Sequence, residues 1–414
     1  SRLWWLRLDH PMLIQSSIGD LVKSICDTFR FSADSPGYLF LDELVYANDW
    51  GLWLKTRYDE QYPLRIVATA SATAALRDRR LESGVGRWEE RCLMPYLFTE
   101  FLDLIGKGID IPCGPDLSTT ISGLFDNPPD PVALAEVEKY RRLFVLTGGF
   151  PELLVRAKSQ DDTDSGNEVS RILASQRVLR SDAIERAVYK DIPQSFGVDD
   201  PMALERLLYV LAGQATGLLS PKGLCAQLEG LSNATFDRYL SYLERAFLVF
   251  TLPNYSAKEA KVQRRGRKLY FVDGAVRNAA LQRGIAPLSN PDEMGILLEN
   301  LAASQMHALG LQSQTRLFHW RDGGDEVDLI YGHPDQPIAF EIASSADHSR
   351  RGLAALMEHD PRFKGRCYLV APDAKLFRPN VTRSGVGTIP YDLFTILIGR
   401  QAEMSLTLSL QRAA

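Results

Sequence analysis

The chain has 414 residues, 45% of them hydrophobic and 24% charged, and its net charge is −5. This length exceeds what one hydrophobic core usually supports, and the composition excludes both a membrane protein and a disordered chain. The negative charge excludes a general attraction for nucleic acid, so any such contact must come from a local basic patch. The five cysteines lack metal-ligand or disulfide spacing, and we find no secretion signal and no membrane-spanning run, which indicates a cytoplasmic protein.

The first hundred residues alternate between strand-like and helix-like patterns. Short apolar runs predict buried strands at 3–8, 38–41 and 64–70, an amphipathic pattern predicts a helix at 18–29, and residues 50–58 also look helical. Strands that alternate with helices in this way form a parallel sheet.

Two adjacent carboxylates, Asp42 and Glu43, follow the second predicted strand. They lie at the carboxyl end of that strand, where open α/β sheets bind their ligands. A Walker B element has this form, and in it Asp42 would hold Mg²⁺ while Glu43 would orient the attacking water. An exposed strand end explains the same two acids without any chemistry.

Further motifs follow in order: a Trp-containing helix, Thr69-Ala70-Ser71, Gly86-Arg87, Pro95 and Phe98-Thr99-Glu100-Phe101. Together with the two acids, this order resembles a prokaryotic AAA-type ATPase family. The resemblance implies that Thr69 or Ser71 is a sensor near the γ-phosphate of ATP. It also implies that Arg87 stabilises charge during phosphoryl transfer, although a solvated arginine explains that residue equally simply. Ala70 stands where the family usually has glycine, so we expect a different turn there.

The phosphate-binding loop of such ATPases is missing from the sequence. No segment matches G-x-x-x-x-G-K-[ST], whose backbone N–H groups and lysine hold the phosphates. The family places this loop just before the strand that matches residues 3–8, and the chain begins at Ser1 without an initiator Met. We therefore expect an N-terminal truncation, with a naturally degenerate ATPase as the alternative. Either way, the chain as given is expected to hydrolyse ATP poorly or not at all.

A helical segment follows the ATPase motifs. Residues 106–131 are rich in Gly, Pro, Asp and Ser and predict a domain boundary, whereas residues 132–189 have a helical pattern typical of a lid. The sequence Gly148-Gly149-Phe150-Pro151 interrupts this pattern and resembles an element of the same family. Paired glycines that end one helix before a proline opens the next explain it structurally. A contact of Pro151 with the adenine ring is the functional alternative.

Residues 204–272 predict a winged helix, because three helix-sized segments precede two strand-like runs. A basic strip in the presumed wing can neutralise DNA phosphates, although a solvated hairpin tip explains it equally well. The residues that we expect to contact DNA are Arg238, Lys261, Arg264, Arg265, Arg267 and Lys268.

The C-terminal region contains a helix with Glu299, a strand with Asp328 and a further strand with Glu341. This pattern resembles a restriction-nuclease core of the PD-(D/E)xK type. The resemblance implies that the three carboxylates jointly bind Mg²⁺ beside a lysine that activates water. Ala343 occupies the lysine position, so we expect DNA cleavage to be crippled.

The sequence thus predicts an α/β chain of four parts. They are a truncated P-loop AAA-type parallel sheet at 1–105, a helical lid at 106–200, a winged helix at 201–275 and a PD-(D/E)xK-like α/β domain at 290–400. Three functions fit: a DNA-associated ATP switch or motor, an ATP-regulated nuclease, and a non-enzymatic DNA-binding or regulatory protein. We predict the first, with ATP and Mg²⁺ as cofactors, DNA as a partner, a homo-oligomer as one assembly, and lid closure as the moving step.

Overall fold

The computed structural model of the chain describes residues 2–29, 31–32, 34–48, 50–70, 87–158, 165–228, 231–262, 266–372 and 385–413. The chain forms two compact units. The first comprises Ser1–Cys92, Arg186–Met202 and Arg238–Phe247, and the second comprises Leu93–Glu185, Ala203–Asp237 and Leu248–Ala414.

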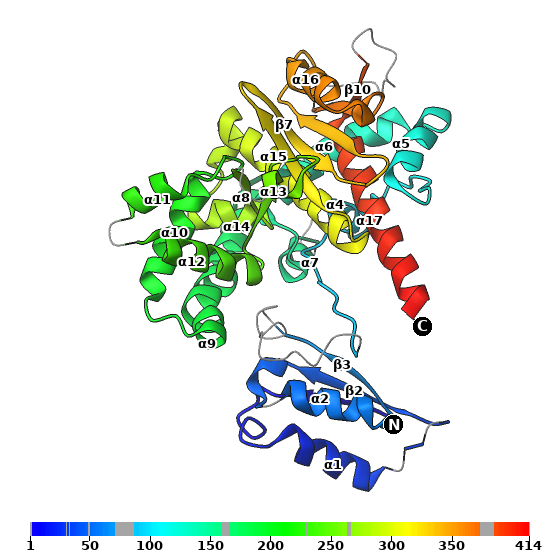
Figure 1. Cartoon of the computed structure of the whole chain (residues 1–414), viewed down its shortest axis with the longest axis vertical. Coiled ribbons are helices and arrows are strands. Elements are labelled where there is room, and N and C mark those ends of the chain that lie inside the picture. The colour runs from blue at the N-terminus through cyan, green and yellow to red at the C-terminus, as the bar shows by residue number, and fades with distance from the viewer. Residues whose placement is uncertain are drawn as a thin grey trace. The chain divides into compact units, whose positions relative to one another are not determined.

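A three-stranded parallel sheet forms the centre of the first unit (Figure 1). Its strands, in spatial order, are β1 (Leu3–Arg7), β2 (Gly37–Asp42) and β3 (Leu64–Ala68). Two helices, α1 (Ile18–Thr28) and α2 (Trp50–Asp59), and the short 3₁₀ helix η1 (Leu44–Tyr46) complete it. The sequence predicted this parallel sheet and both long helices correctly, because each element has a distinct apolar period.

Only one face of this sheet is covered by α1 and α2. Side chains alternate across a strand, so Leu39 and Leu41 join a buried cluster with Ile18, Val22 and Trp50. On the opposite face, Trp5 is 62% exposed and Val67 is 52% exposed. The described part of the first unit therefore presents an apolar sheet face to solvent.

The remaining helices of the first unit come from later in the chain. They are the π-helical η3 (Ala187–Asp191), α9 (Ile192–Phe196) and most of the last two turns of α12 (Asn233–Arg245). Phe196 and Tyr242 stack within this group, with ring centroids 4.2 Å apart.

Helices dominate the early part of the second unit. They are α4 (Phe98–Leu104), α5 (Leu117–Asp126), α6 (Pro131–Thr147), α7 (Pro151–Lys158), α8 (Ser165–Val178) and the π-helical η2 (Leu179–Glu185). The segment 106–131, where the sequence predicted a domain boundary, contains α5. The Asp116 side chain caps α5 by accepting the Thr119 N–H at 2.8 Å.

A helical group and a two-stranded antiparallel sheet follow. The helices are α10 (Pro201–Gly213), α11 (Pro221–Gln227) and α12, and the strands are β4 (Val249–Pro253) and β5 (Arg267–Phe271). Two short helices, α13 (Glu259–Val262) and α14 (Gly274–Ala280), lie before and after β5. The side chain of Asp273 caps α14 by accepting the Ala275 N–H at 2.8 Å.

The C-terminal part contains a five-stranded mixed sheet in the order β10-β9-β8-β7-β6. Strands β8, β9 and β10 are parallel, and β6, β7 and β8 are antiparallel. The strands are β6 (Leu317–Asp322), β7 (Asp325–Tyr331), β8 (Ile338–Ile342), β9 (Cys367–Ala371) and β10 (Val386–Pro390). The helices are η4 (Ala286–Ser289), α15 (Pro291–Gln312), α16 (Arg351–His359), η5 (Pro361–Phe363) and α17 (Tyr391–Ala413).

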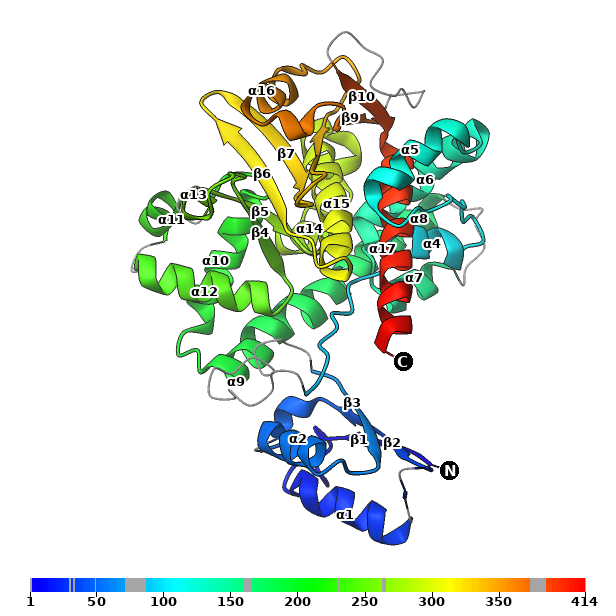
Figure 2. The ribbon, with the colours of Figure 1, turned by 45° about the vertical axis from the view of Figure 1, so that its right-hand side comes forward.

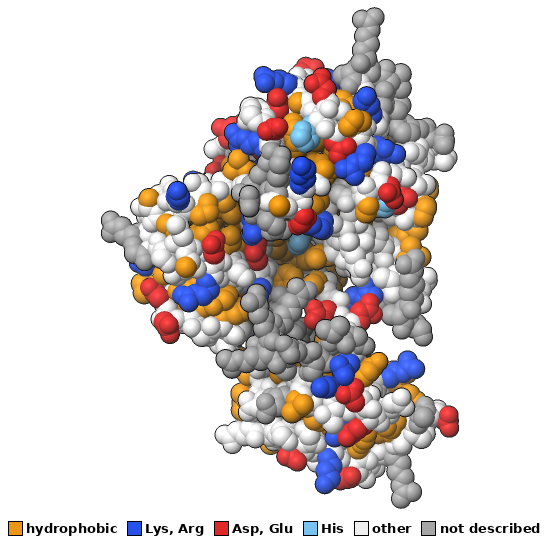
Figure 3. All heavy atoms as spheres, viewed as in Figure 1, with side chains coloured by type: hydrophobic (Ala, Val, Ile, Leu, Met, Phe, Trp, Pro, Cys, Tyr) orange, Lys and Arg blue, Asp and Glu red, His pale blue; other side chains and the backbone are white. Residues whose placement is uncertain are grey.

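Helices α15 and α17 pack against each other beside this sheet (Figure 2). On the face in view in Figure 3, Lys and Arg side chains are interspersed with Asp and Glu side chains. Among the residues that the structure describes, no helix is both long enough and apolar enough to span a bilayer.

Candidate functional site

The carboxyl ends of β2 and β3 bring three of the predicted ATPase residues together. The Thr69 hydroxyl donates a hydrogen bond to Asp42 Oδ1 at 2.6 Å, and the Glu43 N–H donates to Thr69 Oγ1 at 3.3 Å. Backbone bonds fix the same corner, since the Thr69 N–H donates to the Leu41 carbonyl and the Leu44 N–H to the Thr69 carbonyl, both at 2.8 Å. Parallel pairing of β2 with β3 therefore sets the two acids beside the threonine.

Glu43 combines a strained backbone with an unsatisfied carboxylate. Its φ of 56° lies in the left-handed region, which costs a non-glycine residue on the order of 1–3 kcal/mol. Its Oε2 atom is buried without a hydrogen-bond partner among the residues that the structure describes, and its Oε1 atom lies 3.5 Å from Nη2 of Arg186. Such strain and unmet acceptor capacity are typical of a ligand site.

A hollow of about 310 Å³ opens beside these acids on the uncovered face of the sheet. It is lined by Leu3, Trp5, Phe40, Leu41, Asp42, Val67 and Thr69. The polar groups of Asp42 and Thr69 thus border an apolar surface.

Arg87 and Ser71 do not join this corner in the described structure. The Arg87 Nε atom donates to Asp59 Oδ1 at 2.9 Å, at the end of α2. Ser71 lies outside the described residues. The roles expected for both residues remain predictions.

The paired glycines of the lid fit a close approach of three backbone segments. The Gly149 N–H donates to Asp273 Oδ2 at 2.7 Å, and its carbonyl accepts the Tyr96 N–H at 2.6 Å. A Cβ on Gly149 would lie 2.3 Å from the Tyr96 carbonyl oxygen, and Gly148 has a φ of 79°. This packing explains the glycines, whereas the contact of exposed Pro151 with adenine stays a prediction.

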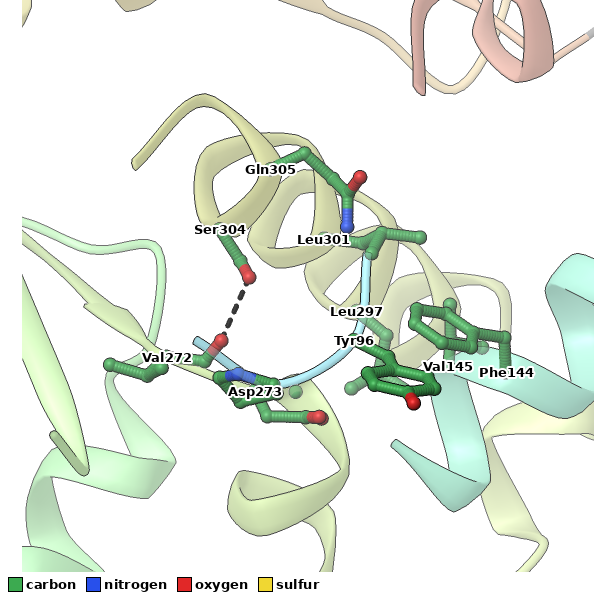
Figure 4. A pocket seen from close by; sticks show the side chains of 11 residues that line it. Tyr96, Phe144, Val145, Val272, Asp273, Leu297, Leu301, Ser304 and Gln305 are labelled. Atoms are coloured by element: carbon green, nitrogen blue, oxygen red, sulfur yellow. Dashed lines mark hydrogen bonds between the residues drawn. The ribbon is translucent and has the colours of Figure 1, made fainter. Parts of the chain in front are cut away.

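A small cavity adjoins this junction (Figure 4). Its volume is about 20 Å³, enough for about one water molecule. In its wall, the Ser304 hydroxyl donates to the Val272 carbonyl at 2.7 Å, and burial raises the pKa of Asp273. The cavity is too small for a nucleotide base.

The predicted DNA-binding residues fall into three groups. Arg238 and Arg267 are exposed. Arg264, Arg265 and the side chain of Lys261 lie outside the described residues. The expectation that Lys268 lies on an exposed wing is wrong, because its residue is only 3% exposed.

Lys268 instead contacts three carboxylates. Its Nζ atom lies 2.6 Å from Asp328 Oδ1, 2.9 Å from Glu299 Oε1 and 3.1 Å from Glu326 Oε1. Side chains alternate along β5, so the ammonium of Lys268 points inward while exposed Arg267 lies on the other face. The sequence did not reveal which face of β5 packs against the carboxylates, and therefore did not reveal that Lys268 is buried while Arg267 is exposed.

Electrostatics in this cluster favour one persistent cation. The nearby carboxylates, led by Asp328, hold the pKa of Lys268 well above its ordinary value, although burial alone would lower it. Burial, reinforced by the negative charge of Asp328, raises the pKa of Glu299 to about 7 and that of Glu341 to about 9. The ammonium is therefore charged at neutral pH while Glu341 is largely protonated.

Three family models match successive parts of the chain. Residues 2–102 match an AAA domain, residues 138–286 match a domain of unknown function (DUF8612), and residues 294–386 match a second domain of unknown function (DUF4143). The chain contains an AAA domain. The corner formed by Asp42, Glu43 and Thr69 lies inside it.

Curated relatives extend over most of the chain. Uncharacterized proteins MJ1544 and MJ1637 of Methanocaldococcus jannaschii are 24% and 23% identical over 81% and 86% of it, covering 67% and 72% of their own lengths. An uncharacterized protein of Haemophilus influenzae is 24% identical over 74% of this chain and 66% of its own length. The chain thus corresponds to about two thirds of these relatives.

One solved structure aligns with nearly the whole chain. The crystal structure of protein VC1899 from Vibrio cholerae aligns with 95% of this chain and 80% of its own, at 13% identity and a TM-score of 0.21. A score this low does not establish a common fold.

Arg186 is the residue near the AAA domain's acids that the sequence analysis missed. It lies outside the 2–102 match, in the region of the first domain of unknown function, and it also approaches Asp191 at 3.6 Å. No motif surrounds it, and its separation from Glu43 along the chain leaves no local signal. Only the folded chain brings the pair together.

Proposed function

We propose that this protein is an ATP-binding and ATP-hydrolysing switch whose chemistry resides in the AAA domain. The observation that carries the proposal is the corner of Asp42, Glu43 and Thr69, where one buried carboxylate oxygen of Glu43 has no partner in the described part of the chain. An acceptor in that state suits a carboxylate that orients water for attack on a phosphoryl group. The AAA family match supports the same reading.

The residues present fit the magnesium side of a nucleotide site. Asp42 would hold Mg²⁺ through its carboxylate, and Thr69 fixes that carboxylate through their 2.6 Å hydrogen bond. When bound, Mg·ATP supplies the reacting phosphoryl group and a compensating positive charge. Arg186 lies 3.5 Å from Glu43 Oε1, where its positive charge would restrain that carboxylate.

The phosphate side of the site is not encoded within this sequence. No segment of Ser1–Ala414 has the glycine-rich loop with its lysine, so productive binding requires such a loop from further sequence. Ser71 and Arg87 complete the proposal as a sensor and as a source of positive charge. Arg87 would have to leave Asp59 for that role.

The decisive experiment measures ATP turnover of the protein together with any sequence that its gene encodes upstream of Ser1. Glu43→Gln is expected to lower kcat by about 100-fold or more, because positioned acid–base groups contribute about 10²–10⁴-fold. It should leave Mg·ATP affinity nearly unchanged, whereas Asp42→Asn should weaken it.

Glu60→Gln is the matched control, since Glu60 is an exposed glutamate of the same domain. Equal turnover by Glu43→Gln and the native protein would reject the assignment of Glu43. A complete absence of turnover, with and without DNA, would reject the ATPase proposal.

We further propose that the switch acts on DNA through a winged helix formed by α10 to α12 with the β4–β5 hairpin. Exposed Arg238 and Arg267 support this proposal, together with the basic residues at 261, 264 and 265 of the sequence. The lid would transmit nucleotide-dependent movement, and homo-oligomers remain part of the hypothesis.

A further inference from the structure

The three residues that the sequence assigned to a divalent metal lie around Lys268. Two of them, Glu299 and Asp328, contact its ammonium directly. The third, Glu341, has its Oε1 atom 3.7 Å from Nε2 of His348, and its Oε2 atom is buried with no partner among the described residues. In the described part of the chain, no group of three or more His, Cys, Asp and Glu side chains has an arrangement that could hold a metal ion.

The ammonium is enclosed by its partners. The Lys268 side chain is 4% exposed, and those of Asp328 and Glu299 are 10% and 18% exposed. The other Asp328 oxygen accepts the Ile342 N–H at 2.8 Å, and the Tyr270 hydroxyl donates to Glu299 Oε1 at 3.0 Å. These hydrogen bonds hold both carboxylates in contact with the lysine. The ammonium therefore lies in a preformed site.

Ala343 stands at the position where the nuclease pattern expects a lysine. Ala343 is 6% exposed and belongs to an apolar core with Val327, Leu353 and Leu369. A lysine there would have to bury its charge among these side chains. The positive charge comes instead from β5, in the region before the C-terminal sheet.

We propose that Lys268 is the resident cation of the cluster formed by Glu299, Glu326, Asp328 and Glu341, and that it excludes divalent metal ions from this centre. The cluster is thus a cation site filled by the protein's own side chain. If Lys268 left the cluster, its buried carboxylates would lose their compensating charge. The ion pairs therefore hold the β4–β5 hairpin on the C-terminal sheet. This inference concerns the second unit and does not depend on the nucleotide site.

Neighbouring bonds place the same hairpin on the edge of the C-terminal sheet. The Tyr255 N–H, just after β4, donates to the His319 carbonyl of β6 at 2.7 Å. The His319 Nε2 atom lies 3.1 Å from the Gly266 carbonyl, just before β5. Lys268 therefore enters the cluster beside the end of the hairpin that these two bonds hold, since the end of β4 pairs with the start of β5.

The test uses Mn²⁺ as the probe, measured by calorimetry and by electron paramagnetic resonance on the full chain. The native protein should show no Mn²⁺ site that Asp328→Asn removes. Lys268→Met should gain one site with at least about tenfold tighter binding, which corresponds to about 1.4 kcal/mol. Adding Asp328→Asn to Lys268→Met should abolish that gain.

Lys364→Met, an exposed lysine of the same domain, is the control and should gain nothing. If Lys268→Met is too unstable to titrate, its Tm with and without Mn²⁺ provides the second readout, and Mn²⁺ should raise it more than in the native protein. A native Mn²⁺ site that depends on Asp328 would overturn the proposal. So would a Lys268→Met protein whose Mn²⁺ affinity and Tm response equal those of the native chain.

Discussion

Asp360 illustrates how one carboxylate fixes a loop through several donors. It accepts the Tyr255 hydroxyl at 2.8 Å and the Arg362 Nη2 at 2.7 Å, both on Oδ2, and its Oδ1 accepts the Arg362 N–H at 3.1 Å. Hydrogen bonding from the Arg362 guanidinium lowers the pKa of Asp360 to about 2. These bonds join the segment after β4 to the 3₁₀ turn η5.

We expect Asp360→Asn to destabilise the second unit by about 1–3 kcal/mol, because the buried Tyr255 hydroxyl and the Arg362 guanidinium lose a charged acceptor. A depressed pKa stabilises the fold above the ordinary carboxyl pKa, and this stabilisation is lost as pH falls toward about 2. Urea unfolding at pH 7 and pH 3 should therefore show a larger difference between native and variant at pH 7. Exposed Asp347→Asn should show neither effect, and a pH-independent difference would contradict the assignment.

Site residues could be predicted from the sequence only where the signal is local. Asp42 and Glu43 follow an apolar strand, and Thr69 ends the next one, so parallel pairing brings them together. Lys268 and Arg186 carry no such signal. Their partners lie far away along the chain, and the inward direction of Lys268 depends on the orientation of one strand.

At the scale of elements, the turn between α6 and α7 depends on what approaches it. Gly149→Ala would place a methyl group 2.3 Å from the Tyr96 carbonyl oxygen. Because this oxygen belongs to the backbone, it cannot move aside as a flexible side chain could. We expect a loss of about 1–3 kcal/mol in the free energy of unfolding of the second unit, as for other overpacked sites. Denaturant unfolding followed by circular dichroism measures it.

Gly123→Ala is the matched control, because no atom lies within 4 Å of the added methyl and the residue is inside helix α5. It should leave stability unchanged or raise it by up to about 1 kcal/mol. Equal stability of the two alanine variants would show that the glycine junction is looser than these distances indicate.

Element prediction succeeded where one period runs through a segment. The strands and helices of residues 3–68 follow their apolar spacing, whereas α5 was overlooked because Gly, Ser and Thr mask its helical pattern. Strand β10 and helix α17 were not predicted as elements, although the predicted C-terminal domain at 290–400 includes β10 and the start of α17. The uncovered sheet face, with Trp5 and Val67, could not be foreseen, because exposure depends on what packs there.

At the scale of the whole molecule, each of the two units has its own buried core. Leu39, Leu41 and Trp50 belong to the core of the first, and Val327, Ala339 and Leu369 belong to a core of the second. The corner proposed to bind the nucleotide, Asp42, Glu43 and Thr69, lies in the first unit, whereas the Lys268 cluster lies in the second. A variant that abolishes ATP turnover should therefore leave the gain of Mn²⁺ binding by Lys268→Met measurable, and the reverse should also hold.

The proposed DNA contact has a testable salt dependence, because it would come from a few local cations on a chain whose net charge is −5. Each phosphate neutralised by a cation contributes about −0.9 to the slope of log K against log salt. Because Arg267 is exposed, Arg267→Ala should weaken binding to duplex DNA of any sequence and reduce the slope by about one. Fluorescence anisotropy over a salt series measures both, with exposed Lys139→Ala in α6 as the control. Identical slopes for the native protein and Arg267→Ala would exclude Arg267 from the interface, because an exposed cation that contacts a phosphate must release a counterion on binding.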